Sequence, residues 1–391
     1  MTPNVPPNLS KTERLERLRL ARSENVGPVT FHQLLSHYGS AASALDALPE
    51  LAARGGRTKR IQIMSQAAAE REWSAVEKIG GRILFCGETE FPPLLAVTEP
   101  PPPLIAVLGH PHLLHQKTLA MVGSRNASAT GMRLAATLAR ELGEAGYVIV
   151  SGLARGIDTA AHKAALATGT AAVLGCGLDI IYPEQNAGLY AAIRDQGVLI
   201  SEMPLGAQPQ ARAFPRRNRL ISGLCRAVIV VEAALRSGSL ITARFANEQG
   251  RDVFAVPGSP LDPRARGANG LLKQGAALIE TAEDVLAALE TVRTLDAPMR
   301  EPVSSDFTAA QPPAIPEPDD TDRRRLLDCL SATPTEIDEI IRHTGLPAST
   351  VNIMVLELDL AGRLEHDIGQ KVSLIDPKAA CDHIESPGAS M

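Results

Sequence analysis

Short apolar runs alternate with amphipathic stretches of helical length through the middle of the chain. The runs share the length and the β-branched content of strands that are buried on both faces. They read LAMVG, YVIVSG, TAAVLG, GVLIS, VIVVE and DVFAVPG between residues 119 and 258. Alternation of this kind predicts an α/β fold, an extended Rossmann-like doubly wound sheet that is mostly parallel. We assign residues 80–290 to this domain.

The N-terminal segment shows a different pattern, with apolar residues at helical spacing from 9 to 75 and no strand-like run. This predicts a helical domain similar to SAM or helix-hairpin-helix domains. The turn Asn25-Val26-Gly27-Pro28-Val29-Thr30 resembles a helix-hairpin-helix turn, whose amides can hold a phosphate. The alternative is a plain helical domain in which Gly27 caps the end of a helix.

Residues 321–376 predict three helices and a two-strand wing that turns at Gly369-Gln370, which is a winged-helix domain. Its third helix, 349–360, carries Glu357 and Asp359 but no Lys or Arg. Because a helix that reads the major groove needs basic or amide side chains, a protein contact is favoured for it. The Pro- and acid-rich segment 296–320 predicts a flexible linker, and residues 377–391 predict a disordered tail.

Composition narrows the class of protein. The 391 residues contain five scattered cysteines without any C-x-x-C pair, which indicates a reducing, cytoplasmic setting and no disulfide framework. No apolar run reaches the length of a membrane span. The net charge is −5, yet residues 212–273 hold eleven basic and four acidic residues, a local net charge of +7. A basic zone on an acidic protein is typical of a directed anion site.

Small and basic residues gather where the predicted strands end. They are Gly123-Ser124-Arg125, the segment 151–156, Gly175-Cys176-Gly177 and Ser201-Glu202. Phe214 lies among Arg212, Arg216, Arg217 and Arg219, and Ser237-Gly238-Ser239 precedes a predicted helix whose first amides can bind an anion. Guanidinium groups, an aromatic face and such a turn favour a phosphate-bearing ligand. The alternative is an ordinary α/β crossover with solvated arginines.

The sequence gives weaker support for a metal site, a nucleotide-binding motif or a catalytic set. His110, His112 and His115 match no standard metal site and have no accompanying carboxylate or thiol, so we expect no metal and no cofactor. The chain lacks G-x-G-x-x-G and Walker A sequences. Arg155, Asp158 and His162 are interpreted as a satisfied polar network, not a catalytic set.

Seven segments in this order resemble the DNA processing protein A family, also called Smf. They are MVGSRNAS, VSGLARGIDTAAH, AVLGCGLDIIYPEQN, LISEMP, FPRRNRLISGL, VVEAALRSGSLITA and VFAVPGS. The resemblance covers residues 119–284, the family core within the predicted domain 80–290. The resemblance implies a cytoplasmic, non-enzymatic protein of natural transformation and recombination. It implies that the protein binds single-stranded DNA on its Rossmann-like domain and forms a homodimer. It also implies that the protein helps to load the RecA recombinase onto strands covered by single-strand binding protein.

Transferred to this sequence, the family's DNA pocket comprises Gly123, Ser124, Arg125, Phe214, Arg217, Asn218, Arg219, Ser237, Gly238 and Ser239. Arg125 and the pair Arg217 and Arg219 suit bidentate phosphate contacts, and Phe214 suits base stacking. Alternatives remain for three of them. Arg219 can pair with Glu232 or cap a helix, Phe214 can be a core residue, and Asn218 can bridge backbone groups in a loop.

Two other functions compete with this one. Rossmann relatives that cleave nucleoside monophosphates, the lysine-decarboxylase-like phosphoribohydrolases, use a glutamate beside a glycine-rich turn, and Glu232 and Glu202 are available here. Their Pro-Gly-Gly-x-Gly-Thr turn is replaced by Arg-Ser-Gly-Ser-Leu-Ile-Thr-Ala, so the position of the acid is lost. A regulator that binds duplex DNA through the winged helix conflicts with the acidic third helix.

Overall fold

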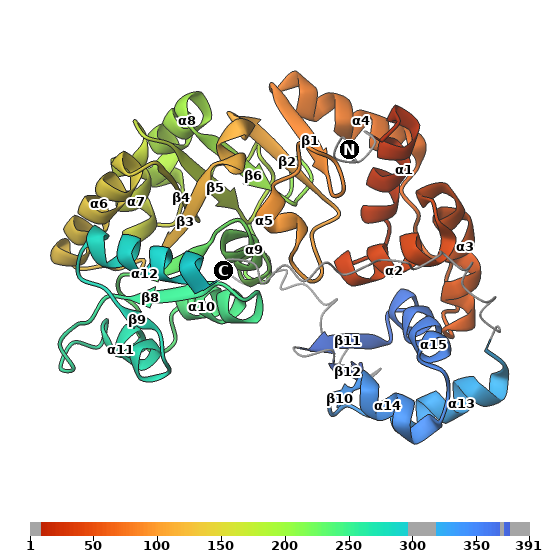
Figure 1. Cartoon of the computed structure of the whole chain (residues 1–391). Helices are drawn as coiled ribbons and strands as arrows, with labels where there is room; N and C mark the ends of the chain where they lie inside the picture. Colours follow the sequence, from red (N-terminus) through yellow and green to blue (C-terminus); the bar gives the residue numbers. More distant parts are fainter. Residues whose placement is uncertain (1–8, 296–317, 368–370, 376–391) are drawn as a thin grey trace, which may run out of the picture. The chain divides into compact units, whose positions relative to one another are not determined.

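The computed structural model describes residues 9–295, 318–367 and 371–375. The chain divides into two compact units, one built mainly from residues 70–300 and the other from 10–69 together with 301–391 (Figure 1). We call them the α/β unit and the helical unit and describe each by itself. Helix α4 (Gln66–Lys78) contains the boundary between them.

The α/β unit is built on a nine-stranded sheet in the order β1-β2-β6-β5-β4-β3-β7-β8-β9. All neighbours from β6 to β9 are parallel, and β1 and β2 extend the β6 edge antiparallel. The strands are β1 (Gly81–Phe85), β2 (Leu104–Gly109), β3 (Lys117–Val122), β4 (Tyr147–Ser151), β5 (Thr170–Leu174), β6 (Val198–Ser201), β7 (Ala227–Val230), β8 (Asp252–Ala255) and β9 (Ala277–Leu278). The predicted fold class is confirmed.

Helices cover both faces of this sheet. One face carries α6 (Ala129–Glu144), α7 (Ile157–Ala165), α8 (Ala187–Gln196) and α12 (Ala282–Leu295). The other carries α5 (Pro93–Ala96), α9 (Ala213–Gly223), α10 (Gly238–Glu248) and α11 (Arg266–Lys273). Short 3-10 turns lie at Pro111–His115 and Glu184–Asn186.

Strand residues alternate between the two cores, as β3 illustrates. Ala120 and Val122 belong to the cluster with α9 and α10, whereas Leu119 and Met121 belong to the cluster with α6 and α7. Because both faces are buried, every position from Leu119 to Val122 is apolar, and this is why the sequence shows a continuous apolar run there instead of alternation.

The order of the strands creates a switch point between β3 and β7. From β3 the chain builds β4, β5 and β6 on one side, and it then returns to place β7, β8 and β9 on the other side. In open α/β sheets the crevice at such a point, beyond the carboxyl ends of the strands, is where ligands bind. The residues after β3 and β7 therefore border the expected binding crevice.

The helical unit joins two segments that are far apart in sequence. Its elements are α1 (Lys11–Ala21), α2 (Pro28–Tyr38), α3 (Ala41–Arg54), α13 (Asp320–Cys329), α14 (Ile337–Thr344) and α15 (Ala348–Leu360), with a small sheet of β10 (Thr335–Glu336), β12 (Lys371–Leu374) and β11 (Leu364–Asp367) in that order. The sequence predicts separate domains for residues 9–75 and 321–376. In the structure they share a hydrophobic core, to which α15 contributes Leu356 and Leu360.

Some predicted segments lie outside the described residues. These are residues 296–317 of the predicted linker 296–320, the wing turn at Gly369-Gln370 and the tail 377–391. Within the described ranges, no helix is both long enough and apolar enough to cross a membrane.

The turn before α2 corrects the alternative role given to Gly27. Helix α1 ends with Arg22 at its C-cap position, and Gly27 is instead the residue that caps the start of α2. Proline at the first helical position favours this boundary, because Pro28 has a fixed φ and needs no partner for an N–H. Asn25 adopts a φ of +59° within the turn.

Candidate functional site

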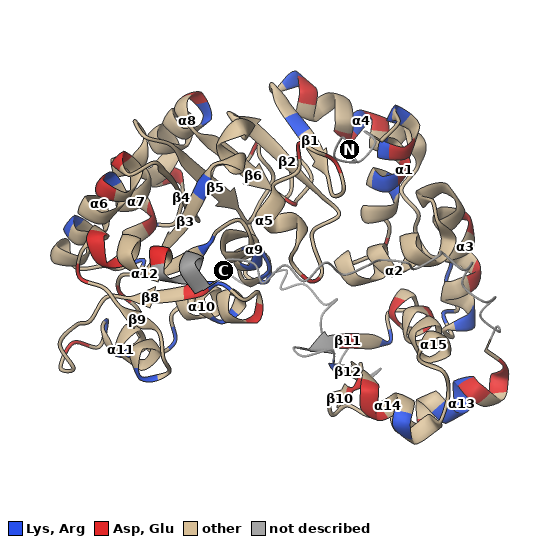
Figure 2. Ribbon diagram, viewed as in Figure 1, with Lys and Arg blue, Asp and Glu red and all other residues tan. Residues whose placement is uncertain are grey.

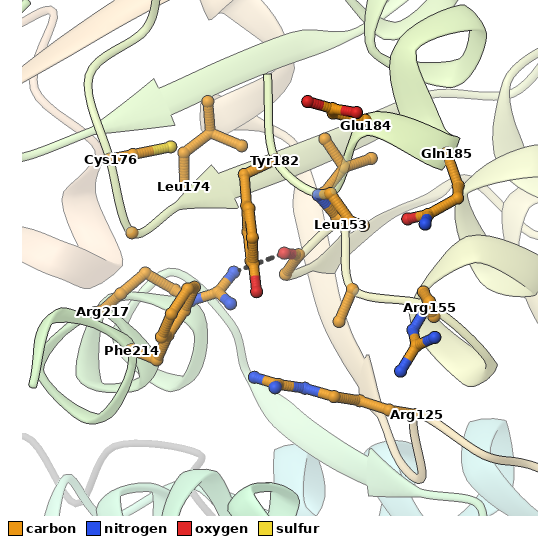
Figure 3. A pocket seen from close by; sticks show the side chains of 14 residues that line it. Arg125, Leu153, Arg155, Leu174, Cys176, Tyr182, Glu184, Gln185, Phe214 and Arg217 are labelled. Atoms are coloured by element: carbon orange, nitrogen blue, oxygen red, sulfur yellow. Dashed lines mark hydrogen bonds between the residues drawn. The ribbon is translucent and has the colours of Figure 1, made fainter. Parts of the chain in front are cut away.

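Two adjoining pockets lie at the carboxyl ends of the central strands. The inner pocket, of about 360 Å³, is bordered by residues that follow β3 and β4, by the end of β5, by α9 and by the segment 182–185 (Figure 3). The outer pocket, of about 770 Å³, extends from the end of β3 to the start of α10. The two share Arg125, Ala154, Tyr182, Phe214 and Arg217, and together we call them the strand-end groove.

Nine of the ten predicted site residues line this groove. Arg125, Phe214 and Arg217 border both pockets, and the outer pocket adds Gly123, Ser124, Asn218, Ser237, Gly238 and Ser239. The position after β3 accepts only glycine without rearrangement. A Cβ on Gly123 would lie 2.6 Å from Cγ1 of Ile157 and 3.0 Å from the carbonyl oxygen of Glu232.

Arg217 makes backbone contacts that the sequence did not predict. It is only 7% exposed, and its Nη1 donates to the carbonyl oxygen of Gly152 at 2.6 Å and to that of Val173. One guanidinium thereby joins the ends of β4 and β5 (Figure 3). A Cβ on Gly152 would lie 2.3 Å from Nη1, so the close approach requires glycine. Arg217 braces the wall of the groove, which leaves less of it free for a bidentate phosphate contact.

A buried carboxylate accompanies this buried cation. Burial lowers the pKa of Arg217 to about 10, an effect that the neighbouring Asp158 charge opposes, so the guanidinium stays charged at neutral pH. Burial also raises the pKa of Asp158, while the charge of Arg217 and the amides of Ala154 and Gly152 lower it. Among the described residues, Nε of Arg217 has no hydrogen-bond partner.

His162 completes a buried network beneath the groove. Its Nε2 accepts from the amide of Leu153 at 3.3 Å, and its Nδ1 lies 2.7 Å from the hydroxyl of Thr170. Burial, with a smaller effect of the Arg217 charge, lowers the pKa of His162 to about 3, so the ring is neutral at physiological pH. Asp158 accepts from the amides of Gly152 and Ala154 at 3.1 and 3.2 Å.

The expected polar network therefore holds for Asp158 and His162 but not for Arg155. Because Asp158 and His162 bind the amides of residues 152–154, that strand end does not present free amides to an anion. Arg155 is exposed and borders the inner pocket.

An aromatic pair forms one wall of the groove. The ring centroids of Tyr182 and Phe214 are 5.5 Å apart with an interplanar angle of 37°. The guanidinium carbon of Arg125 lies 5.4 Å from the centroid of Phe214, and that of Arg217 lies 5.9 Å from it. Phe214 is partly exposed and not a core residue, which settles the alternative given for it. The wall offers a planar face flanked by positive charge.

The turn before α10 forms the opposite side of the outer pocket. Ser237 caps the helix by accepting from the amide of Ser239, and the two hydroxyl oxygens are 2.7 Å apart. Asn218 donates from Nδ2 to the carbonyl oxygen of Gly238 at 3.1 Å. Asn218 lies on helix α9, not in a loop, and it fixes this turn against that helix. The positive end of α10 thus faces the outer pocket.

Arg219 does not belong to the groove. Its guanidinium pairs with the carboxylate of Glu202, and it borders neither pocket. The prediction that Arg217 and Arg219 act as a pair on phosphate is therefore not supported, because helical spacing turns Arg219 away from Arg217. The alternative of an ion pair was right in kind, but the partner is Glu202 and not Glu232.

The basic zone of residues 212–273 is less concentrated than its count suggests. Arg244 pairs with Glu248, and Arg264 pairs with Asp262. Figure 2 shows blue and red positions interspersed along the helices. The positive charges that border the groove are Arg125, Arg155, Arg217 and Arg236.

Sequence reasoning missed Tyr182 and Arg236, and it assigned Arg155 to another role. Tyr182 is 42% exposed and lies in the segment AVLGCGLDIIYPEQN, a few residues after a glycine-rich strand end. An exposed aromatic residue at that position is a signal that could have identified it. Arg236 borders the outer pocket beside the capping turn of α10.

The glutamate that the enzymatic alternative requires is engaged elsewhere. Both carboxylate oxygens of Glu232 accept from Ser128, one from its amide at 2.9 Å and the other from its hydroxyl, at the start of α6. Glu232 borders neither pocket. Burial raises the pKa of the Cys176 thiol to about 11, so the one thiol of the inner pocket is protonated at neutral pH.

Two of the three histidines considered for a metal are engaged with the backbone. His110 and His115 each place Nε2 at 3.0 Å from a main-chain carbonyl oxygen, that of Asp195 and that of Glu90. In the described ranges no cluster of three His, Cys, Asp or Glu side chains is arranged to hold a metal ion.

Comparisons with known proteins agree with this architecture. Residues 82–290 match the family model of DNA recombination-mediator protein A, residues 11–75 a DprA-like N-terminal HHH domain, and residues 310–370 a DprA winged helix domain. The Smf protein of Escherichia coli is 45% identical over 285 residues, which are 71% of this chain and 74% of that protein.

Two solved structures are similar. The X-ray structure of DNA processing protein A from Streptococcus pneumoniae has a TM-score of 0.60 and 33% identity over 72% of this chain and 98% of that one. The protein from Helicobacter pylori, described for its single-stranded DNA binding mode, has a TM-score of 0.50 and 32% identity over 54% of this chain and 96% of that one. The three matched domains, in this order and on this fold, show that the chain belongs to the DprA/Smf family of DNA processing proteins.

Proposed function

We propose that the protein binds single-stranded DNA in the strand-end groove and acts in natural transformation and recombination. The observation that carries the proposal is the wall made by Tyr182 and Phe214, with Arg125 against the ring of Phe214. Base stacking on aromatic side chains next to arginine is how proteins hold single strands without reading their sequence. The Helicobacter pylori relative, whose structure was described for its single-stranded DNA binding mode, supports the choice of ligand.

The two pockets suit different parts of a nucleotide. The inner pocket has a volume of about 360 Å³ and is lined by both aromatic or apolar and polar side chains, which suit the face and the edge of a single unstacked base. The outer pocket carries further polar side chains and the start of α10, and these suit the phosphate backbone. Exposed Arg125 stands where the two pockets meet and is our candidate for the main phosphate contact.

The proposed activity is binding and not catalysis. Glu232 is held at the start of α6, and the Cys176 thiol is protonated, so neither offers the reactive group of a hydrolase. We infer that the protein acts in the cytoplasm as a homodimer. We also infer that it helps to load RecA onto strands covered by single-strand binding protein. The family model's description as a recombination mediator supports this inference.

Binding of a fluorescent oligothymidylate across a salt series tests the proposal. Wild type is expected to bind with an affinity that falls as salt rises, because phosphate contacts release counterions. The change Arg125→Ala should weaken binding and lower the salt slope by roughly 0.7 for a single-strand phosphate contact. Arg216→Ala serves as the control, since Arg216 is exposed and borders neither pocket. If Arg125→Ala bound the oligonucleotide as tightly as wild type, the strand-end groove would be excluded as the DNA-binding site.

A further inference from the structure

The third helix of the winged helix, α15, has two apolar faces that serve two different cores. Val351, Met354 and Leu358 pack in the core of the winged helix itself. Leu356 and Leu360, both at most 2% exposed, pack instead in the core formed by α1, α2 and α3. In a winged helix that reads DNA this helix lies in the major groove. Here its outer face is buried within the chain.

Polar contacts fix the end of α15 on the turn between α1 and α2, residues 25–30, which we call the hairpin turn. Nδ2 of Asn25 donates to the carbonyl oxygen of Leu360 at 3.0 Å, and the hydroxyl of Thr30 donates to the carboxylate of Asp359. On the other side, Nη1 of Arg363 donates to the carbonyl oxygen of Gly55 at 3.2 Å. The winged helix thus covers the hairpin turn directly.

Asp359 occupies a position that suits an anion. Helix α2 begins at Pro28 with Gly27 as its cap and has no side-chain cap of its own. The first turn of a helix carries unsatisfied amides and positive potential, so a negative group is favoured there. Thr30 lies in that first turn and donates to Asp359. A carboxylate of the chain itself therefore lies at the first turn of α2, bound to the hydroxyl of Thr30.

A basic loop lies beside the same turn. The amide of Glu24 donates to the carbonyl oxygen of Gln62 at 3.0 Å, and Arg57 pairs with Glu24 at 2.7 Å, which holds the loop against the turn. The loop presents Lys59 and Arg60, both exposed. Figure 2 shows that α15, by contrast, has no Lys or Arg.

We propose that α15 is an autoinhibitory cover over a second DNA-binding surface, formed by the hairpin turn and the loop 57–60. Its ligand is the phosphate backbone of duplex DNA, and Asp359 blocks that surface in the docked arrangement. The proposal explains why the third helix is acidic. Glu357 is 1% exposed and forms two hydrogen bonds with Arg323, both of 2.9 Å, while Asp359 serves the docking contact.

The test uses the full chain with the strand-end groove disabled by Arg125→Ala and Phe214→Ala, so that its result is independent of the groove. Asp359→Lys is added to release the cover, and Asp328→Lys is the control because Asp328 is exposed on α13 and undergoes the same change of charge. Affinity for a labelled duplex is measured by anisotropy, and hydrogen exchange is measured on the amides of residues 26, 27 and 29–31.

We expect Asp359→Lys to accelerate exchange in the hairpin turn and to raise duplex affinity at least fivefold, while Asp328→Lys changes neither. Adding Lys59→Ala and Arg60→Ala should remove the gain. Thr30→Val, which deletes only the hydrogen bond to Asp359, should shift both readouts in the same direction and decides the question if Asp359→Lys unfolds. The proposal is overturned by faster exchange without a gain in affinity. It is also overturned by unchanged exchange in both variants, or by an equal gain in the control.

Discussion

Replacing Arg217 by methionine tests whether this residue stabilises the ends of β4 and β5 or binds a DNA phosphate. Methionine keeps the length of the side chain but removes its charge and its donors. The carbonyl oxygens of Gly152 and Val173 would lose the guanidinium that now joins β4 to β5. Asp158, which is 6% exposed, would lose the positive charge that stabilises its ionised form.

The expected loss of stability follows from these contacts. Removing one partner of a buried charged pair typically costs about 3–5 kcal/mol, and each charge-assisted hydrogen bond accounts for about 1.5–3 kcal/mol. We expect Arg217→Met to lower the free energy of unfolding of the α/β unit by about 3–5 kcal/mol. For a domain of this size, that corresponds to a fall in melting temperature of roughly 6–20 °C.

The single tryptophan of the chain provides the assay. Trp73 stacks on Phe85 with ring centroids 5.7 Å apart, so its fluorescence reports unfolding of the α/β unit. Urea unfolding of wild type and Arg217→Met is compared with Arg216→Met, the neighbouring exposed arginine on the same helix. Only Arg217→Met should unfold at a lower urea concentration.

The two roles also predict different salt dependence of DNA binding. A brace that neutralises no phosphate leaves the slope of log K against log salt unchanged even when affinity falls. A direct contact would lower it by roughly 0.7. If Arg217→Met were as stable as Arg216→Met and bound DNA with a reduced slope, Arg217 would be a phosphate ligand and our assignment wrong.

Three further changes follow from the same geometry. Phe214→Ala should weaken oligothymidylate binding by about 1–3 kcal/mol, a factor of about 5–150 in Kd by anisotropy, while Phe245→Ala on α10 should not. Arg219→Ala should leave DNA affinity within about twofold of wild type, because its partner is Glu202 outside the groove, and a tenfold loss would refute this placement. Because the pKa of His162 falls from 6.5 to about 3 on folding, its contribution to stability is complete above pH 6.5 and is lost as the pH falls toward 3. Urea midpoints at pH 7 and pH 4 should therefore differ more in wild type than in His162→Gln, and equal differences would count against this explanation.

The architecture of the α/β unit was predictable because the signal is local. A strand buried on both faces must be apolar along its buried length, and the apolar runs around Ala120 and Val228 indicate such strands. Small residues at strand ends, such as Gly123, mark where chains approach closely. Topology then brings the ends of β3 and β7 together, so most of the candidate site could be proposed before the structure.

The sequence could not show where side chains point or which residues far apart in the chain contact each other. Arg217 and Arg219 are two residues apart on a helix, so they point to different surroundings, one into the sheet ends and one toward Glu202. A count of basic residues does not distinguish Arg217 from Arg219. The contact between Thr30 and Asp359 joins positions 329 residues apart, and no local sequence pattern predicts it. Only the acidic character of the third helix hinted that its role was a protein contact.

The central claim is that single-stranded DNA lies against the wall of Tyr182 and Phe214. The most direct measurement is photo-cross-linking of an oligothymidylate that carries 5-iododeoxyuridine to the wild-type protein, with the adduct located by mass spectrometry. The account predicts an adduct on Tyr182 or Phe214 that is lost in Arg125→Ala. Adducts confined to residues 10–69 or 318–375 would contradict it.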